Sequence, residues 1–580
     1  MQADHISTAK FSLLEQIIPD GPHHPFARTM LKHFEHLKTP LQSVRKYPTP
    51  ETQICRFVDS GWKNVGACDL LGFWANRIAT EVKEYIWERE EFDEWEEFYL
   101  FAQHYVLLLA ENSVVSSESG SAFLKLVTNT YETLENDQFS LENVSRRSSE
   151  MTSDSTDEGF QMKVVSTLSL GFRNRFGSGD AMDNESMLYH GGLTSSGRTR
   201  ECIKISLTGV CTHNNLDNLP QARMCHTVSN MGSNTLLLFG GRTSPRGILG
   251  DTWIFDSNRW QLSEEYEGQD FYPEPRYRHC AVSNEAQMQV LIFGGIGKGN
   301  KLLSDFHVFS LKKQKWLRPS MGSVTETPSP RFAASMCSVA KNIALLTGGI
   351  GADGIVLGDM WKITWTEFKV FAERIPVFPE WRQLVRRYGS QLISLKGSSE
   401  VFLIGGVSGG PLMPSSEAIV RITLGEGYFR VTGTSGLTDM PLPLLVGHTA
   451  SLLGNAVVLA GGGAVCFSFG AQWNTRIYIL SWHSANPEDP APKQSAPNRP
   501  ICPIPNLNSS SILNETGKLA SKAIPHVRIT TEEDFTVLMT KGEPAILEGT
   551  YFGDCVALWD WNYLKEKVGV DKSVCSLTFS

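Results

Sequence analysis

An apolar, strand-like run that ends in two glycines recurs along the middle of the chain, and this repeat limits the possible folds more than any other feature. The six glycine pairs are Gly191-Gly192, Gly240-Gly241, Gly294-Gly295, Gly348-Gly349, Gly405-Gly406 and Gly461-Gly462. Successive pairs lie 49, 54, 54, 57 and 56 residues apart. Repeats of this length are supersecondary units that bury their apolar surface only against their neighbours. We therefore predict a mainly β fold, with a β-propeller of six blades over residues 162–482.

Three of the units carry further features of a kelch blade, for which a period of about 50 residues is typical. TLLLFGG is followed by LGDTWIFD and Trp260, VLIFGG by LSDFHVFS and Trp316, and IALLTGG by LGDMWKIT and Trp365. We expect the glycines to adopt positive φ where neighbouring blades crowd. The Asp of each unit is expected to accept hydrogen bonds from turn amides, and the Trp to pack between blades.

Two features that resemble functional motifs are interpreted as parts of this repeat. His226, His279 and His448 recur at the head of a blade's first strand, which indicates a structural rather than a catalytic role. The run from Gly349 to Gly354 fits the GxGxxG fingerprint of dinucleotide sites. That fingerprint needs a helix after it, whereas IVLGDMWKIT predicts a strand, so we reject the nucleotide interpretation.

Residues 1–112 show the period of helices, and the clearest helix is predicted over Glu90–Leu109. Its apolar side chains fall on one face at steps of three and four residues. The other face carries Glu90, Glu91, Asp93, Glu94, Glu96 and Glu97. We interpret these acids as a solvated helix face, with an acidic binding surface as the alternative.

Two polar stretches separate the repeat from its flanks. Residues 113–161 are predicted to be a polar, mobile linker, and residues 483–525 a linker rich in Pro and Ser. The last stretch, 526–580, returns to a globular pattern. We predict strands in HVRIT and EPAILEG there, and helices from Glu532 and in DWNYLKEKVG.

Composition limits the class of protein. The net charge of −9, from 53 basic and 62 acidic residues, leaves no overall electrostatic footprint for nucleic acid. No apolar run is long enough to span a bilayer, and the first residues do not form a secretory signal. The 11 cysteines are scattered, without CxxC or zinc spacing. We therefore expect a cytoplasmic protein with reduced thiols, no membrane association and no metal site.

The flanking segments carry a family resemblance. FSLLEQIIPDGPHHPFARTMLKHF, QICRFVDSGWKNVGACDLLGFW and EEFDEWEEFYLFAQHYVLLLA resemble the C-terminal part of leucine carboxyl methyltransferases. GEPAILEGTYFGDCVALWDWNYLKEKVGVDKSV is similar to the opening of a JmjC/cupin-type domain. Together with the sixth repeat, LVGHTASLLGNAVVLAGGGAVCFSFGAQWN, this order resembles the wybutosine-synthesising family of methyltransferase–kelch–JmjC fusions. The resemblance covers nearly the whole chain.

The resemblance implies an enzyme that uses S-adenosyl-L-methionine to complete wybutosine on phenylalanine tRNA. It would methylate the side-chain carboxylate of the precursor and add a methoxycarbonyl group to its amine. Because a carboxylate is ionised at pH 7, catalysis would consist mostly of positioning. The family's Gly-rich cofactor loop has no counterpart here, and the JmjC-like segment stops before its His-x-Asp/Glu motif. We therefore expect a chain truncated at both ends and inactive by itself, with no assignable catalytic, cofactor-binding or metal-binding residue.

Within this resemblance, Arg28, Arg56 and Trp62 lie in family-like motifs and are candidates for the substrate side of the pocket. Helix packing and surface salt bridges are the alternative interpretation. The basic loops Arg242–Arg246 and Lys298–Lys301 are candidates for RNA contact, or are simply solvated.

Two other functions stay open. The chain is either a non-catalytic propeller scaffold that binds a protein partner through its loops, or a methyltransferase of protein C-terminal leucine carboxylates. The relatives with the latter activity lack a kelch propeller, so the repeat favours the tRNA branch.

Overall fold

The computed structural model describes residues 8–89, 94–113, 161–169, 173–207, 211–213, 218–263, 271–322, 326–395, 398–425, 427–437, 442–466, 468–483, 526–528 and 546–548. The chain divides into two compact units, Met1–Ala491 and Pro492–Ser580. In the second unit, β35 (His526–Arg528) and β36 (Ile546–Glu548) pair in parallel, which confirms the strands predicted in HVRIT and EPAILEG. The two predicted linkers and the predicted C-terminal helices lie outside the described residues.

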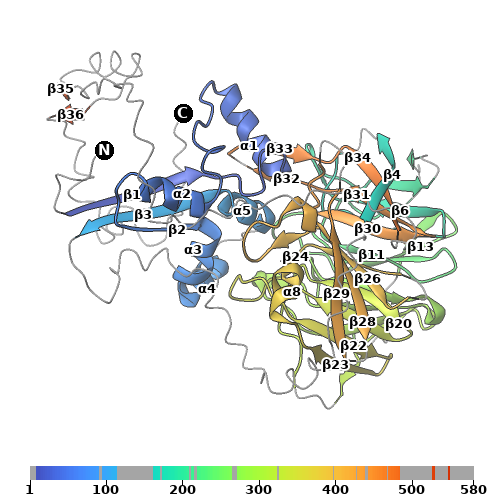
Figure 1. Cartoon of the computed structure of the whole chain (residues 1–580). Coiled ribbons are helices and arrows are strands. Elements are labelled where there is room, and N and C mark those ends of the chain that lie inside the picture. Colours follow the sequence, from blue (N-terminus) through green and yellow to red (C-terminus); the bar gives the residue numbers. More distant parts are fainter. Residues whose placement is uncertain are drawn as a thin grey trace, which may run out of the picture. The chain divides into compact units, whose positions relative to one another are not determined.

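An α/β segment, here called the N-terminal segment, precedes the repeat (Figure 1). Its elements are β1 (Thr8–Gln16), α1 (Pro25–His36), α2 (Pro50–Val58), β2 (Asn64–Asp69), α3 (Leu70–Arg77), α4 (Thr80–Arg89), α5 (Trp95–Ala102) and β3 (Tyr105–Ser113). The strands form an antiparallel sheet in the order β1-β3-β2. On one face Phe57 of α2 packs on Phe11, and on the other Phe73 of α3 packs on Leu109. The prediction that residues 1–112 are helical is therefore wrong for the three strands.

The helix predicted over Glu90–Leu109 is wrong in its second half. The helix α5 ends at Ala102, and Tyr105 begins β3, while residues 90–93 lie outside the described part. The run YVLLLA is apolar at every position, so it satisfies either period. As the central strand it pairs with β1 and β2 at once and is covered on both faces, which outweighs the local helical pattern.

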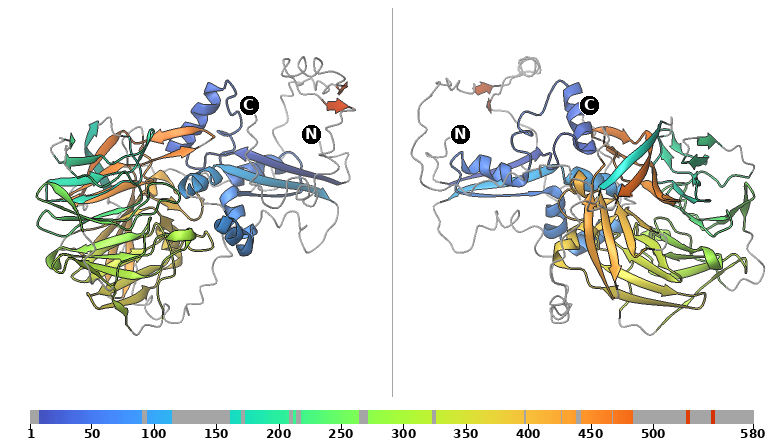
Figure 2. Two further views of the ribbon diagram at one scale, coloured as in Figure 1. Left: turned by 180° about the vertical axis from the view of Figure 1, so that it is seen from behind. Right: turned by 45° about the vertical axis from the view of Figure 1, so that its right-hand side comes forward.

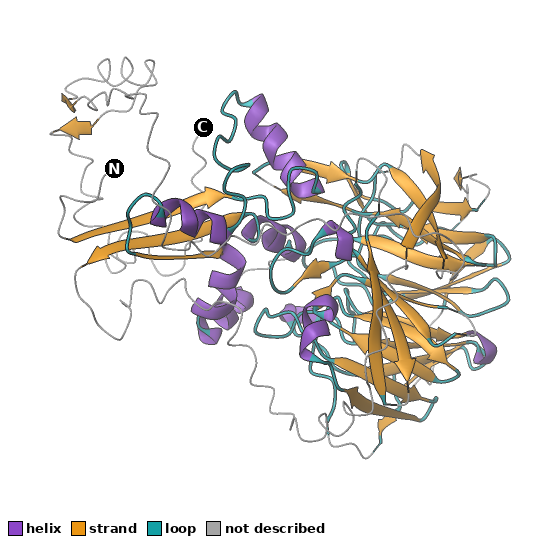
Figure 3. Cartoon of the chain, in the orientation of Figure 1, coloured by secondary structure: helices purple, strands orange, loops and turns teal. Residues whose placement is uncertain are grey.

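Residues 161–483 form sheets instead of helices over most of their length (Figure 3). Among the described residues, six sheets have four or five strands. The first three are β5 (Ser178–Ala181), β6 (Ser186–His190), β9 (Cys202–Ser206) and β10 (Cys211–His213); β11 (Thr227–Asn230), β12 (Leu236–Phe239), β13 (Thr252–Asp256) and β14 (Arg259–Leu262); and β15 (Cys280–Asn284), β16 (Gln289–Phe293), β17 (Phe306–Ser310) and β18 (Lys315–Leu317). The next three are β20 (Ser335–Ala340), β21 (Ile343–Thr347), β22 (Met360–Trp365), β23 (Lys369–Ile375) and β19 (Ser320–Met321); β25 (Gln391–Ser394), β26 (Glu400–Ile404), β28 (Ile419–Gly425) and β29 (Tyr428–Ser435); and β30 (His448–Leu453), β31 (Ala456–Gly461), β34 (Arg476–His483) and β4 (Gln161–Ser169).

Shorter elements fill the connections between these strands. Three two-stranded sheets pair β7 (Leu193–Thr194) with β8 (Gly197–Arg198), β24 (Arg387–Tyr388) with β27 (Val407–Ser408), and β32 (Gly463–Cys466) with β33 (Gly470–Trp473). The helical turns are η3 (Glu285–Gln287), η4 (Lys298–Asn300), α8 (Pro379–Val385) and η5 (Ser415–Glu417). Across the described residues, no helix combines the length and apolar character that a bilayer crossing requires.

The sheets surround a central channel, as in a β-propeller. Their first strands touch in the cyclic order β5, β11, β15, β20, β25, β30 and back to β5. Just before each first strand, one residue adopts a φ of 53–64°, and five backbone hydrogen bonds of 2.7–2.9 Å link these residues in sequence from Gly447 through Phe176 to Gly389. This channel ring consists of Phe176, Cys225, Arg278, Ala333, Gly389 and Gly447. The strand β4 comes from before the repeat and completes the last sheet by pairing with β34.

The double glycines lie where adjacent sheets meet, and all six pairs have positive φ, as predicted. A Cβ atom on Gly295 would lie 2.8 Å from the carbonyl oxygen of Tyr277 and 2.9 Å from the Cβ of His279 in the same sheet. Distances this short are not tolerated between non-bonded atoms, so the position requires glycine both for its φ and for space.

The recurring histidines fill the space that the first glycine of a pair leaves open. A Cβ atom on Gly240 would lie 3.1 Å from the ring of His279, and one on Gly405 would lie 2.6 Å from the ring of His448. His226 is buried in the same way. Burial lowers the pKa of His226 well below its usual range, that of His279 to about 3 and that of His448 to about 4. All three therefore pack as neutral rings at pH 7, in agreement with a structural role.

The Asp of each unit bonds a buried arginine, so the prediction that it caps turn amides is wrong. The Arg331 guanidinium, fully buried, donates to both carboxylate oxygens of Asp359 and to the carbonyl of Gly348. The same arrangement joins Arg223 to Asp251 and Gly240, and Arg276 to Asp305 and Gly294. These arginines were not predicted from the sequence, although they recur three residues before His226, His279 and Ala334.

The tryptophans pack between sheets, as predicted. Trp316 of the third sheet contacts Phe239 of the second at 4.7 Å between ring centroids. Its indole N–H donates to the Thr252 hydroxyl at 2.9 Å. Trp260 and Trp365 lie in the corresponding clusters between the first and second and between the third and fourth sheets.

Candidate functional site at the end of the channel

A cavity of about 680 Å³ occupies the channel and is lined by the first strands of the six sheets. At one end its wall includes the channel ring and Glu96, the second residue of α5. The N-terminal segment therefore contributes a side chain to the channel. Which charged groups line this end of the channel depends on how α5 packs against the channel ring.

Two buried ion pairs hold α5 on the channel ring. Glu96 pairs with Arg278, whose Nη2 lies 2.9 Å from Oε2, and Glu97 pairs with Arg175. The four side chains are each at most 5% exposed. Interpreting the acids of this helix as a solvated face is thus wrong for Glu96 and Glu97. Buried carboxylates need a bound cation or hydrogen-bond donors, and here the sheets supply both.

Hydrogen bonds along α5 extend this contact to the loops that follow the double glycines. The Tyr99 hydroxyl donates to the Gly354 carbonyl at 2.6 Å. The Gln103 amide donates to the carbonyls of Ser408 at 3.1 Å and Gly410 at 2.8 Å. These partners lie more than 250 residues from α5 in the sequence, so only the folded chain brings them together.

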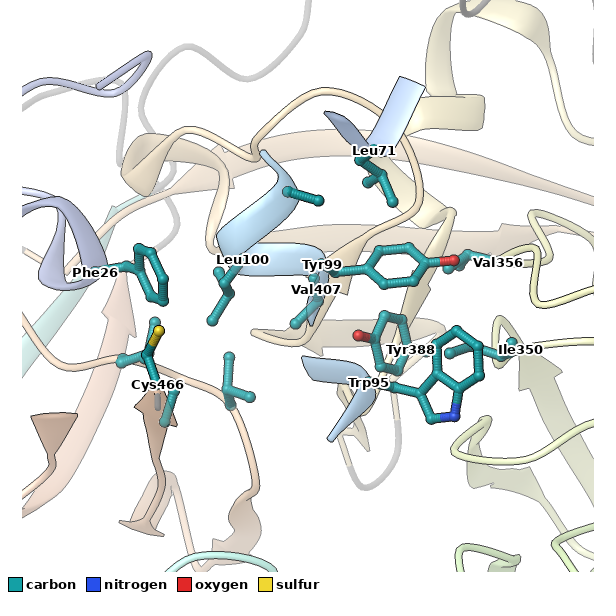
Figure 4. Close-up of a cluster of buried hydrophobic side chains, with 14 of the residues drawn as sticks. Phe26, Leu71, Trp95, Tyr99, Leu100, Ile350, Val356, Tyr388, Val407 and Cys466 are labelled. Atoms are coloured by element: carbon teal, nitrogen blue, oxygen red, sulfur yellow. The ribbon is translucent and has the colours of Figure 1, made fainter. Parts of the chain in front are cut away.

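One apolar cluster joins the two parts of the unit (Figure 4). Trp95 and Tyr99 of α5 lie against Ile350 and Val356 of the loop between β21 and β22, and against Tyr388 of β24. Burial raises the pKa of the Tyr99 and Tyr388 hydroxyls, so both stay neutral. The N-terminal segment and the sheets therefore share a core.

The loop that fits the dinucleotide fingerprint serves this contact. The strand β22 follows it, as predicted, instead of a helix. Gly354, the last glycine of the motif, has φ +69° and lies beside the indole of Trp95. Its carbonyl accepts the Tyr99 hydrogen bond, so the loop binds α5.

Two further histidines are buried where the N-terminal segment meets the sheets. The rings of His24 and His104 lie 5.2 Å apart, and His24 borders a cavity of about 60 Å³. Burial lowers the pKa of His24 to about 4 and that of His104 to about 3. Both rings are therefore neutral at pH 7 and offer no cation to an anionic substrate.

The structure brings together two of the three residues predicted for substrate binding. Arg56 in α2 pairs with Glu15 at 2.9 Å and lies over the ring of Phe57. Phe57 also contacts Trp62, with ring centroids 6.4 Å apart. Arg28 lies on α1, in a different part of the segment. Substrate binding by Arg28, Arg56 and Trp62 stays a prediction.

The described residues do not fit the implied cofactor. Phosphate- and nucleoside-binding turns of this kind join a parallel strand to a helix through glycines, whose N–H groups face the ligand. The strands β1, β3 and β2 are all antiparallel. Where β2 leads directly into α3, the Asp69 side chain caps the helix by accepting from the Gly72 N–H at 2.6 Å. The described residues therefore assign no chemical step to S-adenosyl-L-methionine. In the described part of the chain, no three His, Cys, Asp or Glu residues group as metal ligands.

Comparison with known proteins identifies the relatives of the chain. Residues 220–476 match the family model described as tRNA wybutosine-synthesizing protein 4, beta-propeller. Proteins named tRNA wybutosine-synthesizing protein 4 match at 29% identity in Aspergillus fumigatus (98% of this chain, 53% of the relative), 30% in Candida albicans (83% and 66%) and 31% in Candida glabrata (81% and 64%). A solved structure titled "Structure of YjhT" superposes with a TM-score of 0.40 and 12% identity over 54% of this chain and 99% of that one.

The family match confirms the predicted β-propeller in the region of the double glycines. The chain spans about half the length of the Aspergillus relatives that it matches. Along nearly all of its own length the chain is similar to proteins named tRNA wybutosine-synthesizing protein 4, and its residues 220–476 match the model of their β-propeller.

Proposed function

We propose that this chain acts in the synthesis of wybutosine on tRNA, as the names of its relatives indicate. The observation that carries this proposal is the match of 98% of the chain to such relatives, across the N-terminal segment as well as the propeller. A shared propeller alone would indicate little, because this fold hosts many functions.

The proposal assigns a role to each part of the chain. The six sheets are the six blades of a kelch propeller, over residues 162–482. Residues 1–112 belong to a leucine carboxyl methyltransferase-like domain, and 526–580 to the opening of a JmjC-like domain. The complete protein uses S-adenosyl-L-methionine to methylate, and to methoxycarbonylate, the precursor on phenylalanine tRNA in the cytoplasm. The two buried Glu–Arg pairs support a propeller that positions the methyltransferase part.

A second candidate is a non-catalytic scaffold that binds a partner through the propeller loops. It is favoured by one observation, namely that the described residues do not fit the cofactor. Isothermal titration of the purified chain with S-adenosyl-L-methionine tests this second candidate. We expect no saturable heat from the 580 residues alone, and saturable binding by the chain would exclude the pure scaffold.

Deletion of the gene tests the proposal directly. Phenylalanine tRNA from the deletion strain is digested to nucleosides, and wybutosine is measured by mass spectrometry. We expect wybutosine to disappear and its carboxylate-bearing precursor to accumulate, with both restored by the reintroduced gene. Unchanged wybutosine in the deletion strain would refute the proposal.

A further inference from the structure

One stretch of the N-terminal segment has a charge opposite to that of the whole chain. The chain carries a net charge of −9, but residues 23–47 carry five cations and one acid, Glu35, which gives a net charge of +4. We call the five cations the basic surface; they are Arg28, Lys32, Lys38, Arg45 and Lys46.

The structure places the basic surface on α1 and on the loop between α1 and α2. Lys32, Lys38, Arg45 and Lys46 are exposed, and Arg28 is half-buried. Among the described residues, no carboxylate forms an ion pair with any of the five. Their charges are therefore available to a ligand. Arg56 is not part of this surface, because Glu15 neutralises it.

The other side of α1 is held firmly against the propeller. Phe26 and Met30 are buried there, and the Phe26 ring contacts Phe469. The Thr29 hydroxyl lies 3.3 Å from the side-chain oxygen of Gln472. The neighbouring hairpin, Gly463–Trp473, contains no acidic residue in its sequence. The propeller thus fixes the orientation of the cations without neutralising them.

The charge on the opposite side of the same sheet has the other sign. The helices α1 and α2 lie on one side of the sheet, and α3 and α4 on the other (Figures 1 and 2). The helix α4 exposes Glu81 and Glu84, and its sequence carries three acids and two bases. An asymmetric field of this kind steers a polyanion towards the α1 side and away from the α4 side.

We propose that the basic surface on α1 and the α1–α2 loop holds the phosphate backbone of the tRNA substrate. This inference rests on the proposed function, because the function identifies the polyanion as tRNA. Unpaired, exposed lysines and arginines gain affinity for RNA by releasing its counterions, which makes the affinity depend on salt. Contacts of this type orient the RNA without reading its sequence. The surface adjoins the propeller and therefore presents tRNA at the junction of the two parts.

A charge-reversal experiment with a matched control tests this surface. The variant K32E/K38E/K46E and the control K312E/K315E/K369E change the net charge equally, and all six lysines are exposed. Affinity for labelled phenylalanine tRNA transcript is measured by fluorescence anisotropy over a series of salt concentrations. We expect the first variant to bind at least about tenfold more weakly, with a salt slope smaller by about 2–3, and the control to stay within about twofold.

Several outcomes would overturn the inference. One is an equal loss of tRNA affinity in K32E/K38E/K46E and in the control K312E/K315E/K369E. The others are unchanged tRNA affinity in K32E/K38E/K46E, and no binding of tRNA by the unmodified chain. The neutral variant K32Q/K38Q/K46Q, expected to lose a smaller part of the affinity, excludes misfolding as the cause. Failure of the proposed function is a separate result, because it appears as unchanged wybutosine in the deletion strain, whatever the anisotropy shows.

Discussion

At the scale of single residues, the propeller depends on buried charges that interact with backbone groups. Arg331, Asp359 and the Gly348 carbonyl form one such set, and the indole N–H of Trp361 also donates to Asp359. The Arg331 charge holds the pKa of Asp359 below its usual range, in spite of its burial. A buried ion pair stabilises the fold little more than a well-packed apolar pair would. Loss of one partner is nevertheless costly, because it leaves the other charge buried without a counter-charge.

Replacement of Arg331 by methionine tests this set. We expect Arg331→Met to destabilise the fold by about 3–5 kcal/mol, because Asp359 stays buried without its cation. The double variant Arg331→Met/Asp359→Leu should recover much of the loss. Chemical denaturation measures both. Lys362→Met, which removes an exposed pair with Glu373, should cost less than about 1 kcal/mol, and a similar cost for Arg331→Met would contradict the argument.

The buried histidines predict a loss of stability in acid. His279, whose ring accepts or donates a hydrogen bond with Thr227 at 2.9 Å, has a pKa lowered from 6.5 to about 3 by burial and by Arg276. Between these two pH values only the unfolded chain takes up the proton on His279. The free energy of unfolding is therefore not reduced by this histidine above pH 6.5, and it falls as the pH drops towards 3. The slope from one histidine is at most about 1.4 kcal/mol per pH unit.

The variant His279→Gln isolates this contribution. Unfolding free energies are measured between pH 7 and about pH 4.5, and we expect the pH slope to decrease by up to one proton in the variant. His36→Gln, at an exposed position on α1, serves as the control for the same change of side chain outside the core. If His279→Gln retains the full slope, the ring does not stay neutral on folding.

At the scale of elements, α5 is the link between the N-terminal segment and the propeller. It has eight residues, too few for a stable helix in isolation. Its fold therefore depends on tertiary contacts, namely two ion pairs, the Tyr99 and Gln103 hydrogen bonds and the shared core. Because β3 begins three residues after α5, the same contacts also set the position of the central strand of the N-terminal sheet.

The substitution Glu96→Gln tests the link at its best-buried point. It should destabilise the chain by about 3–5 kcal/mol, since Arg278 is left buried without a counter-charge. Glu94→Gln makes the same chemical change at an exposed residue two positions earlier, and should be nearly neutral. Thermal midpoints at pH 7 provide the comparison. Equal midpoints for the two variants would show that the Glu96–Arg278 pair does not hold α5.

At the scale of the molecule, Met1–Ala491 forms one compact unit in which the core continues from the N-terminal segment into the sheets. The strand β4, which closes the last sheet, also comes from the N-terminal side of the repeat. The two parts therefore share both apolar core and charge pairs.

We expect the N-terminal segment and the propeller to unfold in a single cooperative transition. In scanning calorimetry, the calorimetric and van't Hoff enthalpies of that transition should agree within error. Hydrogen exchange gives an independent measure, with amides of β3 and of β31 protected by similar free energies. Two well-separated transitions, with β3 released first, would contradict the coupling.

The sequence alone determined the repeating part of the fold. The double glycines, the strands before them and the tryptophans between sheets could be predicted, because each repeat meets the same neighbours. Glycine at positive φ and an apolar strand are local properties, and their spacing shows that the units stack. The buried arginines had the same spacing and could have been found in the same way.

The tertiary structure decided whatever depends on a partner far away in the chain. Tyr105–Ser113 is a strand and not a helix because β1 and β2 flank it. Glu96 is buried and not solvated because Arg278, 182 residues later, lies under it at the channel ring. The energy of burying a charge or pairing a strand depends on what lies opposite, and local periodicity carries no information about that.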